Sequence, residues 1–354
     1  MAEVPTTLDQ AMRWLVALGL TAVGLAVLVV LIPAAPMTGD GQYYIQFVRN
    51  GLQHGASSWH ERRLLGPIIV RALPLDPLDG FHVLTVAALA VASMATWLGA
   101  RRALVAIPIL FGTWVVAPNL REFGLVDPLA WAFSAVVWWA TVQRRWYLAA
   151  AVAAVGVLAK EVVLLAAVAA AAAGWDYRRP WISLAIAAPA AVLTALLTVV
   201  FPGSGTDVGF YLGGWISTGL GSLGPARVAY LIFASYGALW LLIPRGLAGL
   251  PNHLRRAAVV YLLAAVCLPL VGSPERMEEA IFPAMIAIVL SATGDWRPAL
   301  VWALALGEAV FAVRAGGDAR LPTVVAWAGL ALACGLAVWS YLPARALRLA
   351  RSTA

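Results

Sequence analysis

Residues 15–37 read LVALGLTAVGLAVLVVLIPAAPM, an uncharged and mostly apolar run. These 23 residues would form a helix about 34 Å long, which matches the hydrocarbon thickness of a bilayer. The apolar core of a signal peptide is shorter, about 7 to 15 residues, so the Ala-Ala-Pro sequence at 34–36 is not interpreted as a cleavage site. We therefore expect an uncleaved anchor helix.

The composition of the whole chain also indicates a membrane protein. Of 354 residues, 62% are hydrophobic and 12% are charged, and the mean hydropathy is +0.86. Soluble domains carry about 25% charged residues because their surface faces water, so a soluble fold is excluded. The longest stretch without a credible span, residues 38–79, is too short for a separate catalytic domain. We expect one transmembrane domain over residues 1–354.

Apolar runs separated by charge pairs, glycine and proline predict an all-α polytopic membrane protein. The pattern indicates a bundle of about 10–12 transmembrane helices, and the sequence divides most simply into twelve spans. The expected spans are 14–36, 80–100, 103–118, 125–142, 146–159, 161–175, 181–202, 226–243, 257–272, 280–293, 298–314 and 321–343.

Two neighbouring spans, 146–159 and 161–175, are shorter than the roughly 20 residues that a lipid-exposed helix needs. A single helix from Trp146 to Gly174 is the alternative, but it would place the arginine pairs at 144–145 and 178–179 on opposite sides of the membrane. We therefore favour a hairpin that turns at Lys160 and Glu161. Short helices are tolerated where they border a water-filled cavity inside the protein.

The charged residues divide unequally between the two sides of this topology. One side carries fourteen arginines and four acids, and the other carries ten bases and twelve acids. Short loops rich in Lys and Arg stay in the cytoplasm. We expect an integral plasma (inner) membrane protein with both termini in the cytoplasm and mixed charges outside. The formal net charge of +7 then reflects topology, and no nucleic-acid partner is expected.

Residue types that hold metals or nucleotides form no recognisable motif. The four histidines lack ligand spacing, the two cysteines fall within expected spans, and no G-x-x-x-x-G-K-[ST] sequence is present. The sequence therefore requires no cofactor, and a divalent metal has no support. Tryptophans near span ends, including Trp175 and Trp181, are typical of an interfacial belt.

The first outer loop, residues 38–79, begins with TGDGQYYIQFVR at 38–49. From Gly41 to His54 the apolar residues recur at near-helical spacing, which predicts an amphipathic helix lying flat on the bilayer. Asp40 brings a carboxylate close to the membrane exit. It is a candidate functional group, or alternatively it caps this helix, since Asp is favoured at the N-cap.

Further candidate groups follow on the outer face. Arg62 and Arg63 present planar guanidinium groups suited to phosphate oxygens, although both side chains could instead reach lipid headgroups. Asp127 precedes Pro128 at a helix start, where a capping role and a ligand role are compatible. The sequence SPERMEEAIFP at 273–283 is either part of the same site or a solvated loop.

Two ionisable residues interrupt the apolar run between Tyr147 and Ala173. Lys160 and Glu161 stand next to each other, and ionisable residues at membrane depth are usually functional. Neighbours along a helix do not face each other, so each side chain is expected to meet a different partner. Glu308, inside a span, is expected to satisfy a neighbour within the bundle.

Together these segments resemble the GT-C superfamily of integral membrane glycosyltransferases, which use polyprenyl-phosphate-linked sugars. The sequence DGQYY at 40–44 is similar to that family's first-loop D-G-x-Y-Y segment, and DPLA at 127–130 is similar to its D-P-L-A at a helix start. RRLLGP at 62–67 resembles its R-x-x-x-P stretch, while KE at 160–161 and residues 275–283 resemble late family positions. The D-x-D motif of oligosaccharyltransferase-type members is not present at Asp40.

The resemblance implies a GT-C-like bundle with interfacial helices in the first outer loop. Its implied activity is transfer of a sugar, with inversion, from a polyprenyl-phosphate donor to a glycan, lipid or protein acceptor outside the cytoplasm. Asp40 would act as the general base. The candidates for binding the donor phosphate are Arg62, Arg63, Lys160 and Arg276. The candidates for binding sugar or acceptor are Tyr43, Tyr44, His60, Glu122, Asp127, Glu161 and Glu275.

A second function class fits part of the same pattern. Helices interrupted near a charged group at the bilayer midplane also mark transport sites, so a transporter or flippase of a lipid-linked or anionic substrate is the alternative. Outward-facing candidate residues and the lack of a large domain for cytoplasmic nucleotide sugars favour a lipid-phosphate donor.

Overall fold

A computed structural model of the chain describes residues 7–32, 34–35, 39–52, 58–100, 102–113, 115–201, 224–267, 278–315 and 321–341. Within these ranges 82% of the residues are helical and none lies in a strand. The all-α expectation is therefore confirmed for the described part of the chain.

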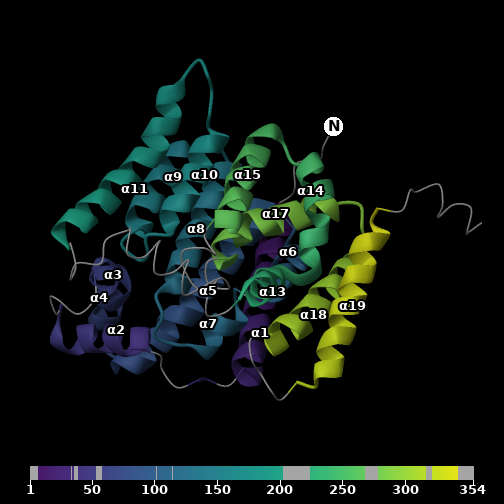
Figure 1. Ribbon diagram of the computed structural model, residues 1–354, viewed down its shortest axis with the longest axis horizontal. Coiled ribbons are helices and arrows are strands. Elements are labelled where there is room, and N and C mark those ends of the chain that lie inside the picture. Colours follow the sequence, from purple (N-terminus) through teal and green to yellow (C-terminus); the bar gives the residue numbers. More distant parts are fainter. Residues whose placement is uncertain are drawn as a thin grey trace, which may run out of the picture.

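Helices follow one another with short connections (Figure 1). The elements are α1 (Thr7–Leu31), α2 (Gly39–Asn50), α3 (Ser58–Arg62), α4 (Leu65–Ala72), α5 (Pro77–Ala100), α6 (Ala103–Phe111), α7 (Ala117–Arg121), α8 (Asp127–Val142), α9 (Trp146–Gly156), α10 (Val163–Ala173), α11 (Pro180–Val200), α13 (Pro225–Tyr236), the 3-10 helix η2 (Gly237–Leu242), α14 (Ile243–Gly249), α15 (Asn252–Cys267), the 3-10 helix η4 (Glu279–Ile281), α17 (Phe282–Ala292), α18 (Pro298–Ala315) and α19 (Thr323–Trp339).

Four helical stretches among the described residues are long and apolar enough to cross a membrane. They are Gln10–Leu31, Pro77–Ala100, Pro180–Val200 and Pro225–Gly249. Each remaining expected span overlaps a helix, but these helices have only 9 residues in α6 to 18 residues in α18. Several apolar helices of spanning length are consistent with a membrane protein.

The expected span 103–118 departs most from the structure. Helix α6 ends at Phe111, and the separate short helix α7 begins at Ala117. Gly112 follows α6 where a Cβ atom would lie 2.6 Å from the backbone oxygen of Ala305 in α18, so the chain approaches its neighbour closely there. Pro118 then starts α7, a position that proline favours.

Small residues hold the helices close together. The main core cluster is rich in alanine and extends over most helices from α1 to α19. Between α18 and α19, a Cβ atom on Gly307 would lie 2.5 Å from the backbone oxygen of Gly329. Such small side chains let helix backbones approach each other, as in membrane-protein interfaces.

The described residues of the loop expected on the outer face form three short helices, α2 to α4, at one end of the bundle, with α2 lying across the direction of the longer helices (Figure 1). A helix, α2, forms over most of the range 41–54 in which the amphipathic helix was predicted, and residues 53–54 of that range lie outside the described residues. Tyr44 and Val48 pack with Val70 of α4 and Phe81 of α5 in a separate apolar cluster. The apolar face thus packs on protein, which anchors the loop.

The hairpin interpretation of residues 146–174 agrees with the described helices. Helix α9 ends at Gly156, α10 begins at Val163, and the two pack against each other and against α8. Near the opposite end of α10, Arg256 of α15 reaches the backbone oxygens of Ala173 and Trp175. The turn between α9 and α10 lies beside the outer loop, where the backbone N–H of Leu65 donates to the oxygen of Leu158 at 3.0 Å.

Candidate active site

Asp40 and His60 meet where α2 and α3 come together. The Nε2 atom of His60 lies 3.0 Å from Oδ1 of Asp40, and 34% of the Asp40 side chain is exposed. The rings of Tyr43 and Tyr44 flank the imidazole, with centroids 4.9 Å and 5.5 Å from it. Asp40 lies in the first turn of α2, so its carboxylate combines a favourable place near the helix N-terminus with a histidine partner.

Two polar atoms beside this pair are buried and have no hydrogen-bond partner among the described residues: the hydroxyl of Tyr43 and Nδ1 of His60. Burial, reinforced by the charge of Glu61, raises the pKa of Tyr43 to about 12, so the phenol remains an O–H donor. In the neutral tautomer that donates from Nε2, Nδ1 of His60 is an acceptor. One unsatisfied acceptor therefore belongs to the histidine that binds Asp40, and one unsatisfied donor belongs to the tyrosine whose ring packs on that histidine.

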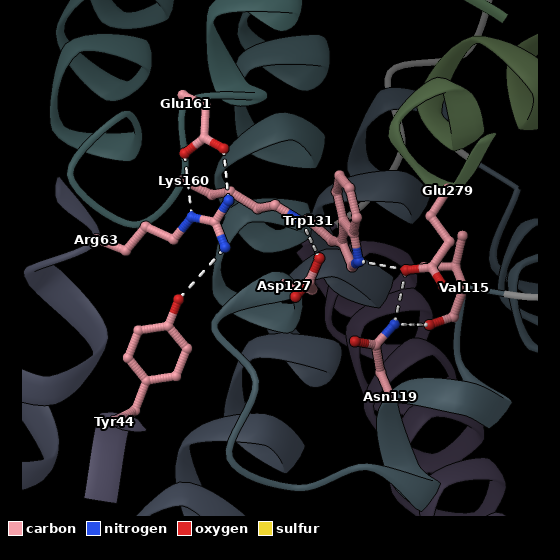
Figure 2. Close-up of polar contacts among 9 residues, drawn as sticks. All are labelled: Tyr44, Arg63, Val115, Asn119, Asp127, Trp131, Lys160, Glu161 and Glu279. Carbon is pink, nitrogen blue, oxygen red and sulfur yellow. Dashed lines mark hydrogen bonds and ion pairs between the residues drawn. The ribbon is translucent and has the colours of Figure 1, made fainter. Parts of the chain in front are cut away.

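Arg63 follows α3 and binds the turn between α9 and α10 (Figure 2). Its Nε donates to Oε2 of Glu161 at 3.1 Å, and its Nη2 donates to Oε1 at 2.6 Å. Its Nη1 donates to the hydroxyl of Tyr44 at 3.4 Å. Burial alone would raise the pKa of Glu161, but the Arg63 guanidinium, together with Lys160 and a backbone hydrogen bond, holds that pKa below its usual range. This is a bidentate pair of the kind that orients a guanidinium firmly.

Lys160, the neighbour of Glu161, points to a different element and forms an ion pair with Asp127 at the start of α8. The two side chains are only 3% and 2% exposed. The ammonium also lies 5.6 Å from the ring centroid of Trp131. The prediction that adjacent Lys160 and Glu161 meet different partners is confirmed. The capping interpretation of Asp127 is wrong, because the N-cap of α8 is Val126 and has no side-chain hydrogen bond.

The polar chain continues past Trp131 to a carboxylate that we did not select from the sequence (Figure 2). Glu279 accepts hydrogen bonds at 2.9 Å from Nε1 of Trp131 and at 2.9 Å from Nδ2 of Asn119. Asn119 also donates to the backbone oxygen of Val115. The signal in the sequence is the acid-rich segment before Pro283, but nothing in that sequence indicates which of its acids turns inward.

Glu278 lies beside this carboxylate and is fully buried. Neither of its carboxylate oxygens has a hydrogen-bond partner among the described residues. Burial raises the pKa of Glu278 to about 8. The hydroxyl of Tyr236 donates to the backbone oxygen of Glu278 at 2.9 Å and so fixes the backbone rather than the carboxylate.

The remaining candidates lie apart from this cluster or outside the described residues. Nε of Arg62 donates to the backbone oxygen of Phe201 just after α11, at 3.1 Å, whereas Arg63 binds Glu161. Glu122 is half-buried just after α7, and no contact within the described ranges joins it to the cluster. Glu275 and Arg276 lie outside the described residues. Glu308 accepts from the backbone N–H of Ala238, as expected for a structural carboxylate.

In the part of the chain that the structure describes, no group of three or more His, Cys, Asp or Glu side chains is arranged to hold a metal ion. The described cluster instead offers one half-exposed carboxylate, a histidine, a phenol and an oriented guanidinium at one end of a helical bundle. Such groups can bind hydroxyls, accept a proton and balance negative charge. Comparisons with models of protein families, with curated proteins and with solved structures find no match for this chain.

Proposed function

We propose that this chain is a membrane glycosyltransferase with a GT-C-like arrangement of helices. It moves a sugar from a polyprenyl-phosphate donor to an acceptor outside the cytoplasm, with inversion of configuration. The observation that carries the proposal is the Asp40 carboxylate, held by His60 and flanked by the unsatisfied Tyr43 hydroxyl and His60 Nδ1. A substrate hydroxyl can both donate and accept, so it complements this set.

The proposed reaction is a single displacement. The acceptor hydroxyl oxygen forms a bond to the anomeric carbon while the bond from that carbon to the phosphate oxygen breaks. Asp40 takes the hydroxyl proton, and polyprenyl phosphate leaves with the bonding electron pair. Asp40 suits this role because 34% of its side chain is exposed, whereas Asp127 is buried against Lys160. His60 is a positioning residue that orients the carboxylate.

Arg63 is our first candidate for the group that balances charge on the departing phosphate. Glu161 and Tyr44 hold its guanidinium in one orientation, and preorganised donors of this kind stabilise charge that develops in a transition state. Lys160 adds a positive charge behind it, already paired with Asp127. Arg62 and Arg276 remain candidates for the donor phosphate. The candidates for binding sugar or acceptor hydroxyls remain Tyr43, Tyr44, His60, Glu122, Asp127, Glu161 and Glu275.

A transporter or flippase is the second candidate function. The observation that favours it is the break between α9 and α10, beside which the buried Lys160–Asp127 pair lies. Interrupted helices next to buried charge are typical of transport sites.

The deciding experiment compares three proteins reconstituted in vesicles and supplied with labelled polyprenyl-phosphate sugars and a panel of glycan, lipid and protein acceptors. They are the wild type, Asp40→Asn, and Asp76→Asn as a matched control, since Asp76 is an exposed acid of the same outer loop that pairs with Arg49. We expect Asp40→Asn to lower sugar transfer about 10²-fold to 10⁴-fold. Donor binding should persist, and Asp76→Asn should transfer normally.

Full activity of Asp40→Asn would rule out Asp40 as the base. Movement of the sugar-lipid across the vesicle membrane without transfer to any acceptor would favour the flippase. A Tyr43→Phe variant sharpens the binding assignment, because loss of its unsatisfied hydroxyl should raise KM for the acceptor with a smaller change in kcat.

A further inference from the structure

A second site lies at the other end of the bundle, in a groove of about 730 Å³ between α10, α11 and α15. This volume falls in the range of pockets that hold small ligands, about 300 to 1,000 Å³. Helix α10 begins at the outer-loop end with Val163 and leads to Trp175 at the groove. Helix α11 begins at the groove with Pro180 and returns to the outer-loop end at Phe201. The groove is therefore separate from the cluster around Asp40.

The walls of the groove are almost wholly apolar. Val168 of α10, Leu184 of α11 and Val259 of α15 all line it and are exposed. Exposed apolar side chains gathered around one hollow need an apolar occupant, because a water-filled groove of this composition is unfavourable. From Val168 to Trp175 the groove follows α10 for about 10 Å, roughly two-thirds of one leaflet of the hydrocarbon core.

Two arginines of α15 close one end of the groove. Arg255 and Arg256 both line it and are exposed. Within the described ranges both arginines donate to backbone oxygens: Arg256 donates to those of Trp175 and Ala173, and Arg255 to those of Ala248 and Leu250. No described carboxylate forms an ion pair with either arginine. Two positive charges therefore remain at the mouth of an apolar groove.

Aromatic residues mark the level of this mouth relative to a membrane. Trp175, Tyr177 and Trp181 are all exposed and lie in or next to the connection between α10 and α11, which forms the upper end of these helices in Figure 1. Exposed tryptophan and tyrosine gather at the height of lipid headgroups. Arg256 donates to the backbone oxygen of Trp175 in this connection, and Arg255 is its neighbour in α15. Both arginines therefore lie at headgroup height as well.

We propose that this groove binds an anionic phospholipid, with an acyl chain between α10, α11 and α15 and the phosphate against Arg255 and Arg256. An anionic lipid fits all three features of the groove. Its acyl chain fits the apolar lining, its phosphate fits the two arginines, and its headgroup lies at the height of the exposed aromatic residues. Basic pockets between membrane helices hold acidic headgroups in the same manner. The proposal does not depend on the reaction at Asp40.

The test measures lipid retention by native mass spectrometry of the purified full chain in detergent. The probes are phosphatidylglycerol, phosphatidylcholine with identical acyl chains, and inorganic phosphate. We expect phosphatidylglycerol to be retained in preference to phosphatidylcholine and to raise the midpoint of thermal unfolding, because a ligand that binds the folded state stabilises it. Inorganic phosphate should do neither.

Two variants address the two halves of the site. Arg255→Gln with Arg256→Gln should weaken phosphatidylglycerol binding about 30-fold, since each basic residue near an anionic surface contributes about fivefold. Leu184→Trp should fill the groove and weaken binding while both arginines remain. The matched controls are Arg144→Gln with Arg145→Gln, which removes the same charge from exposed residues outside the groove, and Leu196→Trp on the same helix α11.

Retention of phosphatidylglycerol by both controls and its loss from both groove variants would support the site. Equal loss in the arginine control would show general attraction of anionic lipid and overturn the proposal. Equal retention of phosphatidylcholine, or an effect of inorganic phosphate as large as that of the lipid, would overturn it as well. Leu184→Trp covers the case in which the arginine variant fails to fold, since it leaves the backbone contacts of Arg255 and Arg256 intact.

Discussion

The two ends of this helical bundle treat positive charge in different ways. At the outer-loop end, Lys160 and Arg63 are buried or nearly so, and each binds a carboxylate, from Asp127 and Glu161 respectively. A buried charge without an opposite charge is strongly unfavourable, so acid and base come together inside the protein.

At the other end, arginines bind the ends of helices. Arg256 donates to backbone oxygens at the end of α10, Arg255 to those at the end of α14, and Arg245 to that of Ser340 after α19. The last carbonyls of a helix lack partners within it and carry partial negative charge, which an arginine satisfies. Arg245 also pairs with the exposed carboxylate of Asp295. Burial therefore requires a carboxylate as partner, whereas exposure also allows a carbonyl and leaves the positive charges of Arg255 and Arg256 available.

The largest effect should come from Lys160→Met. It removes one member of the buried pair and leaves the Asp127 carboxylate without its counter-charge in a nearly inaccessible position. We expect a loss of about 3 to 5 kcal/mol in the free energy of unfolding. The measurement is unfolding by SDS titration in mixed micelles, followed by circular dichroism.

The double variant Lys160→Met, Asp127→Leu is the control for this prediction. Replacing both charges by apolar groups removes the uncompensated carboxylate, so most of the lost stability should return. If the double variant is as unstable as the single one, the pair stabilises the folded protein through packing rather than through charge. The two ends of the bundle would then not differ in how they bind positive charge at the most buried pair.

Glu278→Gln tests a buried carboxylate that has no described partner. Because burial raises the pKa of Glu278 in the folded protein to about 8, its contribution to stability is complete below the unfolded value near 4.5 and declines as pH rises toward 8. Glutamine does not titrate, so the free energy of unfolding of Glu278→Gln should not decline in this way as pH rises. At pH 9 we expect it to be more stable than the wild type by about 1 to 3 kcal/mol.

Unfolding titrations at pH 5, 7 and 9 measure this effect. Glu279→Gln is the neighbouring control, and it should lose stability because Trp131 and Asn119 donate to the Glu279 carboxylate. Equal pH slopes for the wild type and Glu278→Gln would show that the Glu278 carboxylate has partners in solution.

Glu161→Gln should show the opposite pH dependence. Burial raises the pKa of Glu161, but Arg63, Lys160 and a backbone hydrogen bond together lower it in the folded protein. The stabilisation is therefore present above the unfolded pKa and disappears as pH falls through the folded one. At pH 7 we expect the variant to be less stable by about 1.5 to 3 kcal/mol. The gap to the wild type, followed from pH 7 to pH 3, should close; a constant gap would contradict the ion-pair assignment.

The smallest effect should come from Asp295→Asn at the opposite end. Asp295 pairs with Arg245, but 72% of its side chain is exposed. Exposed ion pairs contribute about 0.2 to 1 kcal/mol, so the SDS unfolding midpoint should hardly move. A loss as large as that of Lys160→Met would mean that the two ends do not differ as described.

Much of the helical layout could be predicted from the sequence. Apolar runs mark where helices form, and the isolated Lys160 and Glu161 mark the break between α9 and α10. The partners of these residues could not be predicted in the same way. Asp127 lies 33 residues from Lys160, and Arg63 lies 98 residues from Glu161. Contacts over such distances depend on how the helices pack, which a local pattern does not encode.

Hydrophobicity by itself determined that the described chain is helical and apolar enough for a membrane, because each apolar run must satisfy its backbone within a helix. The tertiary structure alone decided which charges meet. It paired Asp40 with His60, brought Arg62 to the backbone oxygen of Phe201, and brought Glu279 into the polar cluster. The physical reason is that burial makes partners obligatory, while the identity of each partner depends on which helix ends the packing brings together.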